Sequence, residues 1–112
     1  MTKDENANPL AKCLSQKDGG FELTLPASLP GETATHVADL FLMARSHPIA
    51  VDAGAVERID TPCIQVLLSA ARLWREDTSA MTYSAQSAVF TDNLTTLGLT
   101  TAEMEVGDAN HA

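Results

Sequence analysis

The chain has 112 residues, which fits one domain, and its formal net charge is −8. This acidity argues against nucleic acid as a partner, because phosphate binding requires clustered Lys and Arg, and it likewise disfavours an anionic membrane surface. Hydrophobic residues make up 45% and charged residues 20% of the chain, both ordinary for a globular protein, so the chain is expected to fold.

Composition divides the chain into three parts. We expect residues 1–9 to be a disordered N-terminal tail, residues 10–106 to be a single domain and residues 107–112 to be a frayed C-terminal tail. The N-terminus lacks the basic segment and the apolar run of a signal peptide, and no apolar stretch approaches the roughly 18 residues that a membrane helix needs. The sequence therefore predicts a cytoplasmic protein without membrane insertion.

The residues that commonly bind metals are few and scattered. Cys13 and Cys63 form no CxxC pair and have no matching pair of histidines, so they indicate neither a disulfide framework nor a zinc site. His36, His47 and His111 are likewise not spaced for a metal, and we interpret them as solvated. No serine lies in an elbow motif or beside a base, so we expect no catalytic residues, no metal and no cofactor.

The N-terminal half alternates between strand and helix patterns. A strand is predicted over residues 10–14, and Phe21, Leu23 and Leu25 alternate with polar residues as in a second strand. The Asp18-Gly19 pair favours a turn between them, so the two strands should form a hairpin. A helix is expected next, because apolar residues recur at intervals of three and four: Ala34, Val37, Ala38, Phe41 and Ala44. Residues 49–53 then predict a short buried strand.

The most informative stretch is the helix that begins near residue 61. Pro62 suits the first helical position, where its missing N–H has no cost, which makes Thr61 the expected N-cap. One face of this helix is expected to pack against the strand that contains Val51: Ile64, Leu67, Leu68, Ala71 and Trp74. A second flank is apolar without being central to the core: Cys63, Val66, Ala70 and Leu73. This flank is either a stripe that docks a partner or a surface that a neighbouring loop or helix covers.

Three further elements complete the pattern. Met81 and Tyr83 alternate with polar residues as a strand, and Ser87 is suited to cap a helix that ends before Gly98. Residues 104–106 suggest a final edge strand. Strands that alternate with helices imply parallel pairs joined by right-handed crossovers. We therefore predict an α/β fold in which a mixed β-sheet of four to five strands carries helices mainly on one face.

This order of elements, with an Asp-Thr dipeptide at the start of the second helix, resembles the STAS family, named for sulfate transporters and anti-sigma-factor antagonists. The resemblance covers roughly residues 10–106 and is strongest over residues 49–61 and 97–99. The run QVLL at residues 65–68 most closely resembles the short STAS proteins of bacterial chemotaxis systems. Pro62 and Cys63 depart from the family pattern, which usually has a small residue and then Gly after the hydroxyl residue.

The resemblance implies a non-enzymatic domain that binds and switches a protein partner. In sigma-regulating members a partner kinase phosphorylates the hydroxyl residue, which implies that Thr61 is a phospho-acceptor with Asp60 and Pro62 beside the switch. A plain N-cap is the alternative role of Thr61. The implied partner is a kinase or kinase regulator of the histidine-kinase-like ATPase type, and the chemotaxis kinase is the specific expectation. The docking residues would be those of the second flank, Cys63, Val66, Ala70 and Leu73, on a monomer or weak homodimer.

Two other functions stay open. By resemblance to STAS proteins of lipid transport, the domain could be a subunit that docks on the ATPase of an ABC transporter. A hypothesis of another class uses Cys63, because the start of a helix can lower the pKa of a thiol and make it a redox sensor. A small apolar filler is the ordinary role of a lone cysteine.

Overall fold

The computed structural model describes residues 8–107, so the predicted tail residues 1–7 and 108–112, with His111 among them, lie outside the described residues. In chain order the elements are η2 (Ala11–Cys13), β1 (Leu14–Lys17), β2 (Gly20–Thr24), β3 (Ser28–Leu29), η3 (Gly31–Thr33), α1 (Ala34–Met43), β4 (Ile49–Ala53), β5 (Arg58–Ile59), α2 (Thr61–Glu76), β6 (Met81–Gln86), α3 (Ala88–Thr96) and η4 (Thr101–Met104).

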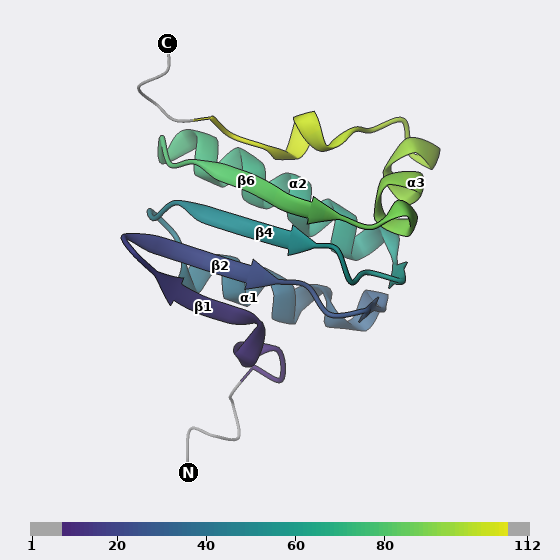
Figure 1. The fold of residues 1–112 in the computed structure, drawn as a ribbon, viewed down its shortest axis with the longest axis horizontal. Helices are drawn as coiled ribbons and strands as arrows, with labels where there is room; N and C mark the ends of the chain where they lie inside the picture. The colour runs from purple at the N-terminus through teal and green to yellow at the C-terminus, as the bar shows by residue number, and fades with distance from the viewer. Residues whose placement is uncertain (1–7, 108–112) are drawn as a thin grey trace.

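The main sheet has four strands in the order β1-β2-β4-β6, and its strand directions are mixed. β1 pairs antiparallel with β2 through the predicted hairpin, whereas β2, β4 and β6 are parallel neighbours. α1 and α2 lie together behind one face of this sheet, and α3 lies at the end where β4 and β6 finish (Figure 1). The predicted α/β fold, with a mixed sheet of four to five strands and helices mainly on one face, is confirmed.

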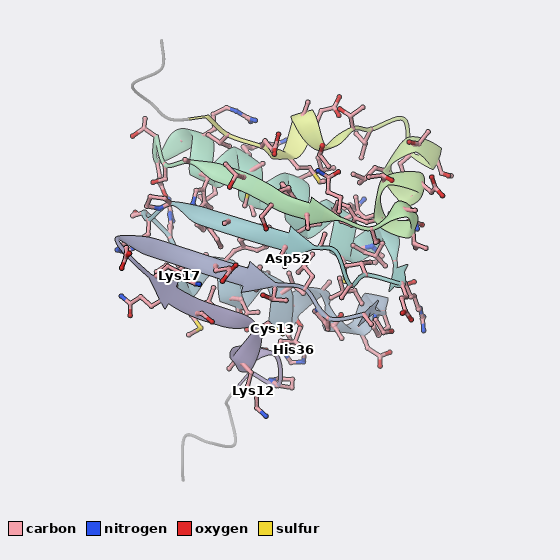
Figure 2. The ribbon with its side chains drawn as sticks, in the orientation of Figure 1. Lys12, Cys13, Lys17, His36 and Asp52 are labelled. Carbon is pink, nitrogen blue, oxygen red and sulfur yellow. The ribbon has the colours of Figure 1, made fainter. Side chains whose placement is uncertain are left out.

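Side-chain alternation along the parallel strands separates the core from the open face of the sheet. β4 shows the pattern most clearly, because Ile49, Val51 and Ala53 are buried while Ala50 and Asp52 are half-buried. Buried or half-buried apolar residues meet in two rows across β2, β4 and β6, one formed by Phe21, Ile49 and Met81 and the other by Leu23, Val51 and Tyr83. The other face carries mainly polar side chains, with Asp52 among them (Figure 2).

The predicted core face of α2 is largely confirmed. Ile64, Leu67, Ala71 and Trp74 are buried, and Leu68 is half-buried rather than part of the core centre. Trp74 donates its indole N–H to the carbonyl oxygen of His47 at 2.7 Å, so the one polar atom of this side chain is satisfied inside the core. The Trp74 ring also meets Phe41 of α1 edge to face at 5.7 Å, which joins the two helices.

Two predicted strands are wrong, for local reasons. Residues 10–14 begin as a turn and η2, because the side chain of Asn8 accepts the N–H of Leu10 at 2.7 Å and this local bond competes with strand pairing. Residues 104–106 follow η4, which is fixed by reciprocal bonds between Thr100 and Glu103 in a capping box. Val106 still pairs with Met81, but as an isolated antiparallel bridge.

A second, two-stranded sheet was not predicted. β3 pairs parallel with β5, which places Leu29 beside Ile59. Each strand has only two residues, too few for alternation to be recognised in the sequence. This small sheet brings the segment before α1 next to the segment before α2, and it thereby sets the position of the candidate site.

Candidate functional site

The Asp60-Thr61-Pro62 sequence lies where β5 passes into α2. Asp60 has extended backbone angles and is the N-cap, and Thr61 is the first residue of the helix, so the prediction that Thr61 is the N-cap is wrong. Pro62 consequently occupies the second helical position, where its missing N–H is equally harmless. The side chains of Thr61 and Pro62 are both exposed. The Thr61 hydroxyl therefore lies at the surface and at the positive end of the α2 dipole.

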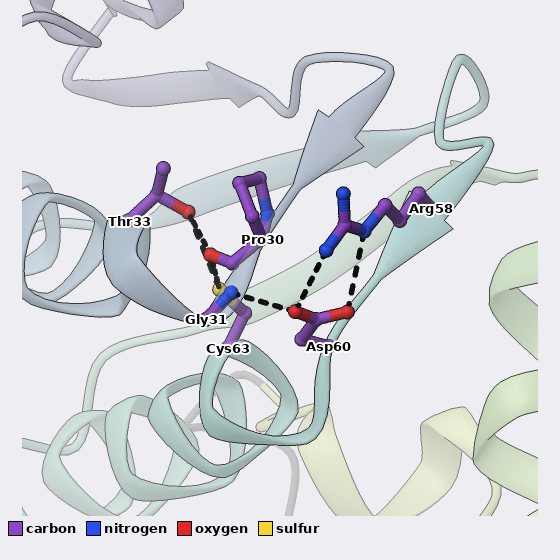
Figure 3. A network of polar contacts seen from close by, with 6 residues as sticks. All are labelled: Pro30, Gly31, Thr33, Arg58, Asp60 and Cys63. Atoms are coloured by element: carbon purple, nitrogen blue, oxygen red, sulfur yellow. Dashed lines mark hydrogen bonds and ion pairs between the residues drawn. The ribbon is translucent and has the colours of Figure 1, made fainter.

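Asp60 is the centre of a polar network (Figure 3). Its carboxylate accepts the backbone N–H of Gly31 at 2.8 Å and forms an ion pair with the Arg58 guanidinium at 3.2 Å. The guanidinium of Arg58, followed by the N–H of Gly31, lowers the pKa of the Asp60 carboxyl below its ordinary value. The carboxylate is thus held in its charged form beside the start of α2.

The carboxylate of Asp60 does not cap its own helix, because its oxygens are bound elsewhere. The backbone carbonyl of Asp60 instead accepts the N–H groups of Cys63 and Ile64, at 3.0 and 3.3 Å. Pro62 has no N–H to offer, so the backbone donors of the first turn of α2 are largely used or missing. An anion at Thr61 would therefore find fewer free amides here than at most helix starts.

Cys63 belongs to the core, which corrects its placement on the second flank. The thiol side chain has 0% exposure and is covered by the segment that leads into α1. Its sulfur lies 3.5 Å from the carbonyl oxygen of Pro30 and 3.5 Å from the hydroxyl oxygen of Thr33. Direct docking of a partner on Cys63 would require this segment to move away.

The rest of the second flank faces α1. Ala70 is buried, whereas Val66 and Leu73 are half-buried, because α1 packs over this side of α2. The two helices leave a shallow groove of about 380 Å³ at the surface. Its lining residues come from α1 and α2: Ala38, Phe41, Leu42, Pro62, Gln65, Val66, Ser69, Ala70 and Leu73. α1 therefore covers one part of the flank, and the groove leaves the other part open at the surface.

The structure brings the groove and the Asp60 network together at Pro62, which lines the groove and lies beside Gly31. Sequence reasoning missed Gly31, Arg58 and Thr33, because their relation to the site depends on the pairing of β3 with β5. The Pro30-Gly31 pair is the nearest signal in the sequence, and by itself such a pair indicates only a turn.

The described residues, 8–107, contain no group of three or more His, Cys, Asp and Glu side chains that could hold a metal ion. Within the same range, His47 is exposed and His36 is half-buried. No helix in this part of the chain has both the length and the apolar character needed to cross a membrane. The two cysteines in this range are free thiols, and Cys13 is the last residue of η2, directly before β1 (Figure 2).

Comparison with known families agrees with this architecture. A family model described as "Mlab, STAS domain" matches residues 14–106, which is most of the chain. The chain belongs to the STAS domain family. STAS domains are generally binding domains with regulatory roles rather than enzymes. Searches of curated proteins and of solved structures each found no match.

Proposed function

We propose that this STAS domain is a non-enzymatic, cytoplasmic regulatory protein that binds an ATPase partner through the start of α2 and the adjoining groove. The observation that carries the proposal is the exposed Thr61 hydroxyl next to Pro62, which itself lines the groove between α1 and α2. A partner seated in the groove would therefore also cover Thr61. A modification of that hydroxyl could then control binding without a change of fold.

Phosphorylation of Thr61 is the switch that we propose. A phosphate adds about −1.5 to −2 charges at neutral pH, here next to the carboxylate of Asp60. Arg58 is the cation already bound to Asp60, so the phosphate would compete for its guanidinium. Release of Asp60 from Arg58 would leave the N–H of Gly31 as the remaining donor to its carboxylate. The added charge would thus alter both the surface at Thr61 and the junction between η3 and α2.

Two classes of ATPase fit this proposal. A histidine-kinase-like ATPase, with the chemotaxis kinase as one example, would be both the partner and the source of the phosphate. The ATPase of an ABC transporter is the second candidate, because the chain also resembles STAS proteins of lipid transport. Hydroxyl phosphorylation is required only for the first class. A redox sensor based on Cys63 would need an accessible thiol, and the Cys63 side chain has no exposed surface.

Site-specific photo-crosslinking in the native host would test the proposal and separate the two partners. A benzophenone side chain at Gln65, an exposed residue of the groove, should link the protein to an ATPase that mass spectrometry can identify. The matched control is the same side chain at Val89, which is exposed on α3. Thr61→Glu should reduce the adduct and Thr61→Ser should not. Identical adducts at Gln65 and Val89, or none at Gln65, would refute the proposed binding of an ATPase at this surface.

Intact-mass measurement of the protein purified from its host tests the switch separately. A phosphorylated species that disappears in Thr61→Ala supports the kinase partner. If no phosphorylated species is found under any growth condition and Thr61→Glu retains the adduct, Thr61 is not a switch. An adduct with a transporter ATPase under those conditions would assign the second function.

A further inference from the structure

The groove between α1 and α2 has the properties of a docking site for a helix. Seven of its nine lining residues are apolar, none is charged, and the two polar ones are Gln65 and Ser69. On α2 the lining runs from Pro62 to Leu73, which corresponds to about 17 Å or three helical turns at 1.5 Å per residue. This length suits the apolar stripe of a short amphipathic helix.

The walls of the groove are tied together at both ends. At one end Asp60 binds the N–H of Gly31 at 2.8 Å, which joins the start of α2 to the turn before α1. At the other end the Arg45 guanidinium binds the Asp77 carboxylate at 2.9 Å, and these two residues follow α1 and α2 respectively. The edge-to-face contact of Phe41 with Trp74 joins the same helices in between. The groove is therefore preformed, and a partner would bind it without first separating α1 from α2.

The groove leaves apolar surface exposed on its α1 side. Leu42 lines the groove and is 56% exposed, although its neighbours Leu40 and Phe41 are buried. Met43, the next residue, is 62% exposed but does not line the groove. Leu42 thus offers a partner a large apolar contact at the rim, and Met43 provides a matched residue outside it.

Charges along the α1 side of the groove indicate the sign of the partner. Glu32 is exposed in η3 and directly follows Gly31. Gly31 in turn lies close to Pro62, which lines the groove. Asp39 is exposed on α1 one turn before Leu42. Residues 31–43 contain no Lys or Arg, and Arg58 is already paired with Asp60. A partner that carries Lys or Arg on this side would meet carboxylates without a competing cation from α1.

We propose that the groove binds a basic amphipathic helix of a partner protein, with apolar residues seated between α1 and α2 and with Lys or Arg residues over Glu32 and Asp39. This proposal names the partner chemistry of the surface put forward under "Proposed function" and rests on that function for its biological role. A helix fits better than an extended peptide, because both walls are helices whose backbone groups are bonded internally and give a strand no edge to pair with. A second copy of this chain is disfavoured, because each copy has a net charge of −8.

Fluorescence anisotropy with labelled model peptides would test the proposal without knowledge of the natural partner. The probe is an 18-residue Leu/Lys helix with Leu at positions i, i+3, i+4 and i+7. One control peptide has the same composition in a scrambled order without an apolar stripe, and a second keeps the stripe but has Glu in place of Lys. The wild-type protein should bind the probe at least ten-fold more tightly than either control. Equal binding of the probe and the scrambled peptide would overturn the proposal, because charge alone would then explain it.

Matched variants place the binding on this surface. Leu42→Glu should weaken binding of the probe at least ten-fold, and Met43→Glu should change it less than three-fold. The double variant Glu32→Lys, Asp39→Lys should weaken binding more than the control Asp18→Lys, Asp92→Lys, which makes the same change of net charge at two exposed residues elsewhere. Urea melts would verify that each variant is folded. Equal effects of Leu42→Glu and Met43→Glu, or of the two double variants, would show that the probe does not bind in the groove.

Three outcomes separate the proposed helical partner from a homodimer and from the proposed ATPase-binding function. Sedimentation equilibrium that shows a dimer broken by Leu42→Glu would mean that a second copy occupies the groove, and the proposal would be wrong. The peptide assay does not involve phosphorylation or an ATPase. Loss of the Gln65 adduct in cells with normal peptide binding would therefore count against the proposed function alone. An ATPase adduct at Gln65 with no probe binding would count against the helical partner alone.

Discussion

The Asp60 carboxylate accepts the backbone N–H of Gly31 at 2.8 Å, and this bond joins segments that are 29 residues apart in the chain. The N–H of Asp60 in turn donates to the carbonyl oxygen of Leu29 at 3.0 Å, as an extension of the pairing between β3 and β5. The start of α2 is therefore positioned by long-range bonds. A carboxylate at residue 60 has a structural role in addition to any role beside a regulated hydroxyl.

Replacement of this carboxylate should change how stability depends on pH. Because the folded state lowers the pKa of Asp60, the wild-type protein gains stability from the ionised carboxylate above the ordinary value of 3.8 and loses it as the pH falls through the lower folded pKa. Asp60→Asn should therefore be less stable than wild type at pH 7, and the difference should shrink below pH 3.8. Urea melts at several pH values measure this, with Asp92→Asn on α3 as the control. If the stability difference between Asp60→Asn and wild type stayed constant with pH, the folded state would not lower the pKa of Asp60.

Truncation of Leu67 on the core face of α2 should cause a large loss of stability, because this side chain is only 1% exposed. Leu67→Ala should reduce the free energy of unfolding by about 2–5 kcal/mol, because it removes buried methyl groups and leaves a cavity. Leu42→Ala removes the same atoms from an exposed residue and should change stability by less than about 0.5 kcal/mol. Urea denaturation of both variants provides the comparison. Similar losses would mean that α1 and α2 pack differently.

The buried Tyr83 hydroxyl has no hydrogen-bond partner within residues 8–107. Burial, with a smaller effect of Glu105, raises the pKa of this phenol above its ordinary value. Tyr83→Phe should leave stability unchanged or increase it, by no more than the roughly 1–3 kcal/mol that an unsatisfied buried group costs. Trp74→Phe is the contrast, since it removes a satisfied donor and should destabilise the protein. A clear loss of thermal stability in Tyr83→Phe would reveal a partner for the hydroxyl.

The two thiols should react at different rates with a thiol reagent such as Ellman's reagent. Cys13 is half-buried, and burial raises its pKa, which slows the reaction without preventing access. Cys63 has no exposed surface and should react only when the protein unfolds. The folded protein should therefore react slowly with one equivalent of the reagent, through Cys13, and with a second equivalent only in denaturant. Cys13→Ser should abolish the reaction of the folded protein. Rapid reaction of Cys63 in the folded protein would restore the redox-sensor hypothesis.

The sequence was sufficient for features that depend on neighbours along the chain. The Asp18-Gly19 turn, with Gly19 at a φ of 73°, and the Ser87 cap are determined within a few residues, and both are confirmed. Helical periodicity also identified the core face of α2. Periodicity did not predict that Cys63 and Ala70 are buried. It gives the direction of each side chain around the helix axis, but not the neighbouring segment that covers that side chain. The contact between Gly31 and Asp60 could not be predicted either, because it depends on the pairing of β3 with β5, and each of these strands has only two residues.

The role of Thr61 in folding distinguishes a regulated hydroxyl from a helix cap. Thr61 is the first residue of α2 and the side chain of the N-cap, Asp60, makes no capping bond, whereas Ser87 caps α3 by accepting the N–H of Phe90 at 3.0 Å. Ser87→Ala should therefore cost about 1 kcal/mol of stability. Thr61→Ala should change stability by less than about 0.5 kcal/mol, because it removes no cap and introduces a good helix former.

Thr61→Glu tests the same distinction with added charge. The helix dipole favours a carboxylate at this position by about 0.3–1 kcal/mol, while the neighbouring Asp60 carboxylate opposes it, so the net change in stability should be small. Parallel urea melts of Thr61→Ala, Thr61→Glu and Ser87→Ala measure all three effects under one set of conditions. If the two Thr61 variants fold like wild type, any loss of partner binding in them originates at the surface. A loss in Thr61→Ala as large as that in Ser87→Ala would instead make the Thr61 hydroxyl a structural cap.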